Sequence, residues 1–224
     1  MKNTVIIVGG GMGLRMNNTL PKQFMEINHR PLLFYTIERF YHFDQNISII
    51  LVLPETYHIY WNKWCKKYSF QIPHHLVAGG EARYHSVKNG LSMTERKSLI
   101  AIHDAVRPFI TTDFLQKAFE TAAKNGSAVP VLNVNETVRQ ISDTSSTILP
   151  RKEIYTVQTP QIFKAEWIYK GYEQPYTKDI TDDAILVEKA GYNLTFMEGL
   201  RYNIKITFPE DMLLAEAWLK NDIH

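Results

Sequence analysis

The chain has 224 residues, 45% of them hydrophobic, which is enough to bury the core of one large domain. Its 25 lysines and arginines nearly balance its 23 aspartates and glutamates, and no basic run occurs, so bulk electrostatic binding to nucleic acid or to an acidic membrane is excluded. Cys65 is the only cysteine, which excludes an internal disulfide framework, and the sequence shows neither a bilayer-length apolar run nor a secretory leader, so we expect a cytoplasmic protein without a membrane partner.

The first half of the chain alternates between short apolar runs and amphipathic stretches. The apolar runs, most of them rich in β-branched residues, predict buried strands at 3–8, 47–53, 74–80, 99–105 and 127–132. Apolar residues at helical spacing predict helices at 31–43, 55–68, 83–93 and 111–126. Continuously apolar strands that alternate with helices predict an α/β fold, a Rossmann-like, doubly wound and mostly parallel sheet.

The alternation breaks near residue 133. Residues 133–163 are polar, rich in Thr and Ser and weakly alternating, which predicts a β-hairpin arm at about 133–156 with a turn around Asp143. Such an arm cannot bury both of its faces, so we expect it to pack on a partner chain. Further helices are predicted at 164–174, 181–191 and 209–221 and further strands at 193–198 and 203–207, all within a single domain of residues 1–224.

The first predicted strand leads into the glycine loop VGGGMGLRM at residues 8–16. A dinucleotide-binding loop needs a third glycine where Met16 stands, and a Walker loop needs Gly-Lys followed by Ser or Thr, so the residue types exclude both. Glycine amides form a concave donor surface for phosphate oxygens, and the cations of Arg15 and Lys22 can close around a triphosphate. The alternative is a tight turn with two solvated cations.

The segment HDAVRP places a carboxylate at the carboxyl end of the strand at 99–105, the edge at which parallel sheets bind ligands. A single carboxylate beside a triphosphate is a common protein ligand of Mg²⁺, so we expect Asp104 to hold the metal. His103 points to the opposite face of the strand, which indicates a structural role. The alternative is that Asp104 only caps the following turn.

Two further segments offer groups to a nucleotide. In AGGEARYHSV, Gly79 and Gly80 allow the backbone to approach a flat ring, and Arg83 and Ser86 supply donors, which indicates recognition of a base and a ribose. In NIKIT, Lys205 lies in an otherwise apolar strand, where its ammonium is unfavourable unless it reaches water or an anion. A phosphate is the natural anion, and a solvent-facing lysine is the alternative.

The segments GGGMGLRM, PKQ, AGGEARYHSV, HDAVRP, TPQIF, TDDA and NIKIT occur in this order. In this arrangement the sequence resembles the 2-C-methyl-D-erythritol 4-phosphate cytidylyltransferases of the non-mevalonate isoprenoid pathway over nearly the whole chain. The resemblance implies a Mg²⁺-dependent transferase that joins CTP and 2-C-methyl-D-erythritol 4-phosphate, releases pyrophosphate and forms a homodimer through the arm. A ribitol-5-phosphate cytidylyltransferase, a nucleotidylyltransferase for another base and a nucleotide-binding module without activity are the alternatives.

The resemblance also implies roles for individual residues. The catalytic, phosphate-stabilising residues would be Arg15, Lys22, Arg151 and Lys205, and the metal ligand would be Asp104. The nucleotide-binding residues would be Gly9, Gly10, Gly11, Gly13, Gly80, Arg83, Ser86 and Ala105. The residues that bind the polyol phosphate would be Arg107, Thr137, Thr159 and Thr181.

The sequence departs from the family pattern at three places. The loop has Gly9 and Gly10 where alanines are common, which should change the fit of a nucleotide little. The arm carries Glu136 and Arg139 where Asp and Lys are usual, which keeps both charges and changes their reach. Tyr202 stands directly before NIK, where an acidic residue is usual, and this position bears on the choice between the two polyol phosphates.

Overall fold

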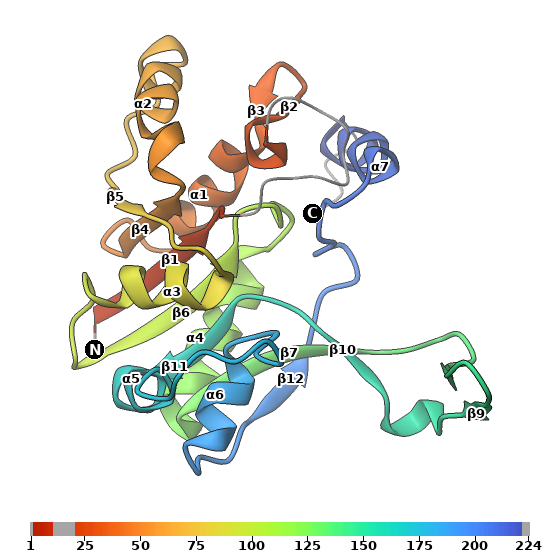
Figure 1. Ribbon diagram of the computed structural model, residues 1–224. Coiled ribbons are helices and arrows are strands. Elements are labelled where there is room, and N and C mark those ends of the chain that lie inside the picture. The colour runs from red at the N-terminus through yellow and green to blue at the C-terminus, as the bar shows by residue number, and fades with distance from the viewer. Residues whose placement is uncertain (1, 11–20, 221–224) are drawn as a thin grey trace.

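The structure is a computed structural model that describes residues 2–10 and 21–220 (Figure 1). Its centre is an eight-stranded sheet in the order β10-β7-β11-β6-β1-β4-β5, with β12 also paired to β7. The strands are β1 (Lys2–Val8), β4 (Ser48–Leu53), β5 (His75–Ala78), β6 (Ser98–Asp104), β7 (Ser127–Asn133), β10 (Tyr155–Val157), β11 (Gln161–Lys164) and β12 (Phe196–Glu198). The four strands β6, β1, β4 and β5 run parallel, which confirms the mostly parallel sheet that the sequence predicts.

Helices cover both faces of this sheet. On one face lie α1 (Leu32–Phe43), α2 (His58–Lys67) and α4 (Thr112–Asn125), and on the other α3 (Arg83–Leu91), α5 (Ala165–Gly171) and α6 (Ala184–Lys189). Successive strand residues serve the two faces in turn: Ile7 packs in the first core and Ile6 in the second, and both are fully buried. The doubly wound arrangement is therefore confirmed. Among the helices of residues 2–10 and 21–220, none combines the length and the apolar character that crossing a membrane requires.

The ends of α4 show how closely local signals set an element. The hydroxyl of Thr111 accepts the backbone N–H of Phe114 at 3.2 Å, which caps the helix start. Gly126 ends the helix with φ of 96°, a left-handed conformation that glycine adopts without a Cβ penalty. Both ends lie where the sequence predicts them.

Two segments differ from the prediction. Residues 203–207 form no strand. The N–H of Ile206 donates to the carbonyl of Val106 and the carbonyl of Asn203 accepts from the side chain of Arg107, so neither group is free to pair with a neighbouring strand. β11 was not predicted as a strand of the sheet, and it inserts antiparallel between β6 and β7. Both differences bring segments from late in the chain beside β6 and the loop that follows it.

The predicted arm is a hairpin of β8 (Arg139–Ile141) and β9 (Ser146–Ile148), followed by the short 3₁₀ helix η4 (Arg151–Glu153). It extends away from the body of the molecule (Figure 1). Its apolar side chains Ile141 and Ile148 are 74% and 59% exposed. The remaining elements are β2 (Glu26–Ile27), β3 (Arg30–Pro31), η2 (Lys22–Phe24), η3 (Glu55–Tyr57) and α7 (Pro209–Lys220).

A half-buried histidine supports the aromatic core under α2. The indole N–H of the fully buried Trp61 donates to Nε2 of His74 at 2.8 Å. The other ring nitrogen, Nδ1, lies 2.8 Å from the carbonyl oxygen of Ile72 and donates to it, so His74 is neutral with its proton on Nδ1. Burial lowers the pKa of His74.

We expect the free energy of unfolding to fall as the pH is lowered from about 7.5 to about 5.5. The reason is that histidine in the unfolded chain takes up a proton near pH 6.5, whereas folded His74 resists protonation. The unfolded state then binds more protons, and acid favours it. Urea unfolding at both pH values should show that the free energy of unfolding falls less between them in His74→Gln than in the wild type. The exposed His42 near the end of α1 provides the matched control: His42→Gln should keep the wild-type loss, and an unchanged loss in His74→Gln would contradict the assignment.

Candidate active site

The loops that follow β1, β5 and β6 lie at one edge of the sheet. The N–H of Gly9 donates to the carbonyl of Val52 at 2.9 Å, and the N–H of Ala105 donates to the carbonyl of Val8 at 3.0 Å. These bonds continue the parallel ladder past the ends of the strands and hold the loops side by side. The polar segments therefore meet at the carboxyl ends of the strands, where the sequence places the ligand site.

Ser86 connects two of these loops. Its hydroxyl is almost fully buried, accepts the N–H of Gly80 at 3.1 Å and donates to the carbonyl of Ala82 at 3.2 Å. A Cβ atom at Gly10 would lie 3.2 Å from this hydroxyl oxygen, and one at Gly79 would lie 3.3 Å from it. The structure thus brings together the predicted residues Gly10, Gly80 and Ser86, and it explains why small residues stand on both sides of the serine.

Two predicted nucleotide-binding positions have their amide groups engaged within the fold. A Cβ at Gly9 would lie 2.6 Å from the Cδ2 atom of Leu53, so this glycine permits close packing against β4. Ala105 is fully buried, and its carbonyl accepts the hydroxyl of Thr36 at 2.9 Å. Because the N–H groups of both residues donate to neighbouring strands, they hold the site's backbone in place.

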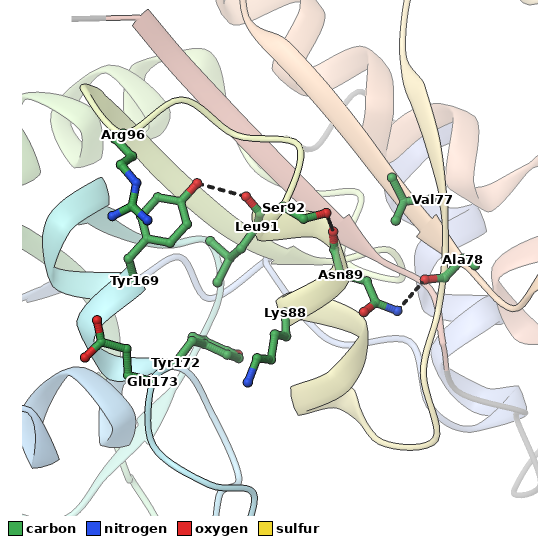
Figure 2. A pocket seen from close by; sticks show the side chains of 10 residues that line it. All are labelled: Val77, Ala78, Lys88, Asn89, Leu91, Ser92, Arg96, Tyr169, Tyr172 and Glu173. Atoms are coloured by element: carbon green, nitrogen blue, oxygen red, sulfur yellow. Dashed lines mark hydrogen bonds between the residues drawn. The ribbon is translucent and has the colours of Figure 1, made fainter.

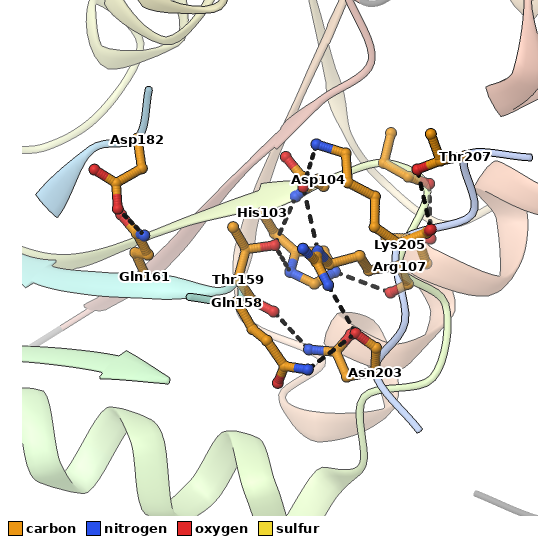
Figure 3. Close-up of polar contacts among 12 residues, drawn as sticks. His103, Asp104, Arg107, Gln158, Thr159, Gln161, Asp182, Asn203, Lys205 and Thr207 are labelled. Atoms are coloured by element: carbon orange, nitrogen blue, oxygen red, sulfur yellow. Dashed lines mark hydrogen bonds and ion pairs between the residues drawn. The ribbon is translucent and has the colours of Figure 1, made fainter. Parts of the chain in front are cut away.

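Asp104 is the centre of the site. One of its carboxylate oxygens, Oδ2, lies 3.0 Å from the Lys205 ammonium and 3.2 Å from Nε of Arg107, and Oδ1 lies 3.7 Å from Nε of Arg83 (Figure 3). Burial alone would raise the pKa of Asp104, but Arg83, Lys205 and Arg107 together hold it well below its usual value. The carboxylate is therefore ionised, and three predicted cations converge on the predicted metal ligand.

A second layer of hydrogen bonds fixes the backbone of Asp104. The hydroxyl of Thr159 accepts the N–H of Asp104 at 3.1 Å and donates to Nδ1 of His103 at 3.1 Å. Nε2 of His103 donates to the carbonyl of Arg107 at 3.0 Å, and burial lowers the pKa of this histidine to about 4. The neutral His103 has the structural role that the sequence indicates. The hydroxyl of Thr159 is engaged in these bonds and the residue is only 6% exposed. Its expected contact with the polyol phosphate stays a prediction.

Arg83 has a different position from the one expected for a residue that reads a base. Its two terminal nitrogens donate to the carboxylate of Asp183 at 2.9 and 2.7 Å, and this aspartate is fully buried and also accepts the hydroxyl of Tyr172 at 2.7 Å. Burial alone would lower the pKa of Arg83, but the charge of Asp183 outweighs this effect. Arg83 therefore ties α3 to α6 and presents only Nε to Asp104. Sequence reasoning missed Asp183, although it lies in the quoted segment TDDA.

Other predicted residues have no hydrogen bond or ion pair with Asp104 among the described residues, or lie outside them. Thr137 and Arg151 are exposed on the arm, where Nη1 of Arg151 donates to the carbonyl of Asn135 at 2.8 Å. Thr181 is exposed in the loop before α6. The predictions for Gly11, Gly13 and Arg15 lie outside the described residues, and so does the prediction for the side chain of Lys22, of which the structure describes the backbone only.

The donor set limits the kind of metal site that this edge can form. In residues 2–10 and 21–220, no three His, Cys, Asp or Glu side chains are grouped so that they could hold an ion. Asp104 supplies one carboxylate, and among the described residues its Oδ1 atom has only the long contact with Arg83. Mg²⁺ commonly binds through one or two carboxylates and the phosphates of its substrate. These residues fit a cation that arrives with a polyphosphate, and they do not form a complete protein cage.

Two hollows lie away from Asp104. A cavity of about 760 Å³ lies between α3 and α5, and no predicted site residue lines it (Figure 2). Its polar side chains are engaged locally: Asn89 donates to the carbonyl of Ala78, and the Arg96 guanidinium stacks on the ring of Tyr169 at 4.9 Å. A larger hollow of about 1370 Å³ runs along the arm and β12, and its lining includes Tyr155, Phe196 and Arg201.

Comparisons with known proteins agree with this geometry. The family model described as 2-C-methyl-D-erythritol 4-phosphate cytidylyltransferase matches residues 3–221. A protein of that name from Phocaeicola vulgatus is 43% identical over 217 residues, which cover 97% of this chain and 99% of the relative. A protein of that name from Bacteroides fragilis is 43% identical over 219 residues, which cover 98% of this chain and 100% of the relative.

Solved structures lead to the same family. The crystal structure of 2-C-methyl-D-erythritol 4-phosphate cytidylyltransferase from Thermus thermophilus aligns with a TM-score of 0.80 at 27% identity and covers 98% of this chain and 100% of its own. The structure of 4-diphosphocytidyl-2C-methyl-D-erythritol synthase from Anaerococcus prevotii aligns with a TM-score of 0.82 at 28% identity and covers 98% of both chains. With its fold, its converging cations and its sequence in agreement, the chain belongs to the 2-C-methyl-D-erythritol 4-phosphate cytidylyltransferase family.

Proposed function

We propose that this chain transfers the cytidylyl group of CTP to 2-C-methyl-D-erythritol 4-phosphate, forming 4-diphosphocytidyl-2-C-methyl-D-erythritol and pyrophosphate. Membership of the family supports the substrates. The observation that carries the proposal is the meeting of Arg107 and Lys205 on the ionised Asp104 at the carboxyl edge of the sheet. This arrangement offers positive charge to two reacting phosphates and one carboxylate to the cation that accompanies them.

The reaction is a direct displacement. An oxygen of the methylerythritol phosphate attacks the α-phosphorus of CTP, a new P–O bond forms, and the bond to pyrophosphate breaks. A phosphate monoester is largely ionised near neutral pH, so the attack needs no strong general base. The protein's contribution is to place the two phosphates in line and to stabilise the charge that develops on them. We assign this stabilisation to Arg15 and Lys22 near the α-phosphate and to Lys205 at the substrate phosphate.

Mg²⁺ is part of the proposal. Asp104 would hold it, and when bound it supplies charge neutralisation to the phosphates of CTP. Before ligands arrive, Asp104 is paired with Lys205 and Arg107, which keeps the carboxylate ionised and prevents three like-charged cations from facing one another. A cation held by Asp104 would neutralise this carboxylate and would leave the ammonium of Lys205 free to reach a phosphate. Lys205 can move because its side chain is 44% exposed.

We also propose that the arm joins two copies of the chain. Support comes from the exposed apolar side chains of Ile141 and Ile148. It comes also from the arm itself, which carries Thr137 and Arg151 and extends away from the body of the molecule (Figure 1). In a homodimer these two residues would serve the site of the partner copy.

The choice of polyol phosphate is tested by turnover. With CTP and Mg²⁺, we expect kcat/KM for 2-C-methyl-D-erythritol 4-phosphate to exceed that for ribitol 5-phosphate by roughly tenfold or more, because the two substrates differ in branching and chain length. Release of pyrophosphate with each substrate provides the measurement. The reverse preference would favour the ribitol-phosphate enzyme. A chain that binds CTP and releases no pyrophosphate with either polyol would be a binding module.

Tyr202 is the reason for comparing the two polyol phosphates, since it stands where an acidic residue is usual in the family. In the structure its ring packs edge-on against Trp218 of α7, with centroids 5.3 Å apart, and it is 46% exposed. It therefore offers no carboxylate to a substrate hydroxyl at this position.

A further inference from the structure

We infer that Asn203 is a positioning residue for the transfer reaction and that it fixes the backbone of Lys205 beside the carboxylate of Asp104. The inference rests on the proposed function for the part that Lys205 plays at a substrate phosphate. Asn203 is fully buried, lies two positions before Lys205 and was not singled out by sequence reasoning.

The segment around Lys205 belongs to no sheet, so its position depends on individual contacts. A long, half-exposed lysine reaches one defined place only when the backbone beneath it is fixed. Two fully buried residues, Asn203 and Ile206, stand on either side of it. The N–H of Ile206 donates to the carbonyl of Val106 at 3.0 Å, which anchors the far side two residues beyond Asp104.

Asn203 anchors the near side through both its side chain and its carbonyl. Its side-chain Nδ2 donates to the carbonyl of Thr159 at 2.7 Å, and its own carbonyl accepts Nη1 of Arg107 at 2.7 Å (Figure 3). Thr159 and Arg107 are the residues that hold the N–H and the Oδ2 atom of Asp104. Asn203 therefore fixes Lys205 relative to the same two residues that fix the carboxylate it contacts.

A further side chain closes the turn that precedes Asn203. Gln158, only 6% exposed, accepts the N–H of Leu200 at 3.0 Å and donates to the Leu200 carbonyl at 2.9 Å. A Cβ at Gly199 would lie 2.5 Å from the Gln158 side-chain oxygen, so the turn fits closely over the glutamine. The turn thus enters Asn203 from a fixed direction.

Only one of these contacts of Asn203 depends on its being asparagine. Any residue could offer the backbone carbonyl, whereas the bond to Thr159 needs a side-chain donor. The side-chain oxygen Oδ1 is buried and has no hydrogen-bond partner among the residues that the structure describes. A buried acceptor without a partner is unfavourable, so the donor end is the part of the amide that this site uses.

The test measures both substrates and adds a double-mutant cycle. In Asn203→Ala, we expect KM for 2-C-methyl-D-erythritol 4-phosphate to rise roughly tenfold, since the lost hydrogen bond fixes the backbone that leads to Lys205. KM for CTP should change less than about twofold, because the N–H of Asp104 keeps its own bond to the hydroxyl of Thr159. In a Lys205→Gln background, the Asn203 substitution should add less than about a twofold further loss, because there is no longer an ammonium to position. Asn203→Ser, which keeps a short donor, should recover part of the KM and serves as the second variant if the alanine variant is unstable.

The matched control is Asn89→Ala. Asn89 makes the same kind of bond, from Nδ2 to the carbonyl of Ala78 at 2.9 Å, on an exposed part of α3, so this variant should keep both KM values. Two results would show that Asn203 acts only on the fold and would overturn the inference. One is a double variant whose loss of activity equals the product of the two single losses, and the other is an equal rise of both KM values in Asn203→Ala.

Hydrogen exchange of the ligand-free chain separates this inference from the proposed function. Amides of residues 199–207 should exchange faster in Asn203→Ala than in the wild type, and Asn89→Ala should leave them unchanged. If the wild type does not turn over and exchange rises as expected, the anchoring holds and the proposed function fails. Unchanged exchange in Asn203→Ala overturns the inference whatever the activity.

Discussion

The Asp104→Asn variant is expected to lose roughly a hundredfold to a thousandfold in kcat/KM for the transfer from CTP, the loss typical of removing one charged or preorganised group at a phosphoryl or acyl transition state. The amide keeps the shape of the carboxylate but offers no negative charge to a cation. It also leaves three positive side chains facing a neutral group, so Lys205 and Arg107 are no longer held in one geometry. The half-saturating concentration of Mg²⁺ should rise as well.

The fold of Asp104→Asn should survive. Lys205 can turn toward water, Arg107 keeps the carbonyl of Asn203, and Arg83 keeps Asp183. Thermal unfolding monitored by circular dichroism should therefore show a transition close to that of the wild type. Asp113→Asn, which changes an exposed aspartate at the start of α4, is the control and should keep full activity. Near-wild-type kcat/KM in Asp104→Asn at ordinary Mg²⁺ concentrations would remove this carboxylate from the reaction.

The second large effect is expected for Lys22→Ala. A charged donor directed at the developing charge of the α-phosphate contributes about 3–4 kcal/mol, so turnover should fall on the order of a hundredfold or more. The loss should appear in kcat more than in KM for either substrate, because the charge develops in the transition state. Steady-state kinetics with saturating CTP and polyol phosphate measure this directly.

The residues that follow Lys22 are held in place by contacts of their own. The next residue, Gln23, is almost fully buried and donates its side-chain amide to the carbonyl of Gly9 at 2.7 Å, and Phe24 is fully buried. These contacts anchor the segment without the lysine side chain, so the variant should fold. Lys63→Ala on the exposed surface of α2 is the matched control. A Lys22→Ala enzyme with wild-type kcat would show that the displacement proceeds without this cation.

The sequence by itself determined the architecture and the edge of the sheet at which the site lies. Short, continuous β-branched runs indicate strands that are covered on both faces. The helical spacing of apolar residues in the stretches between them predicts the helices. The glycines and the aspartate that follow these strands are local in sequence, and parallel pairing alone brings Asp104 beside Gly9. The segment NIKIT likewise indicated that the ammonium of Lys205 reaches an anion or water, although its apolar pattern wrongly suggested a strand.

Only the tertiary structure decided what the polar side chains do to one another. Arg83 and Asp183 are 100 positions apart, and nothing local to either residue indicates that they pair. Thr159 and Asn203 offer groups that would suit a ligand equally well, and their roles follow from the insertion of β11 beside β6 and from the path of residues 199–207. The physical reason is that hydrogen bonds and ion pairs act over about 3 Å. Their partners are therefore set by how distant segments come to lie together, whereas hydrophobic periodicity can be read within a single segment.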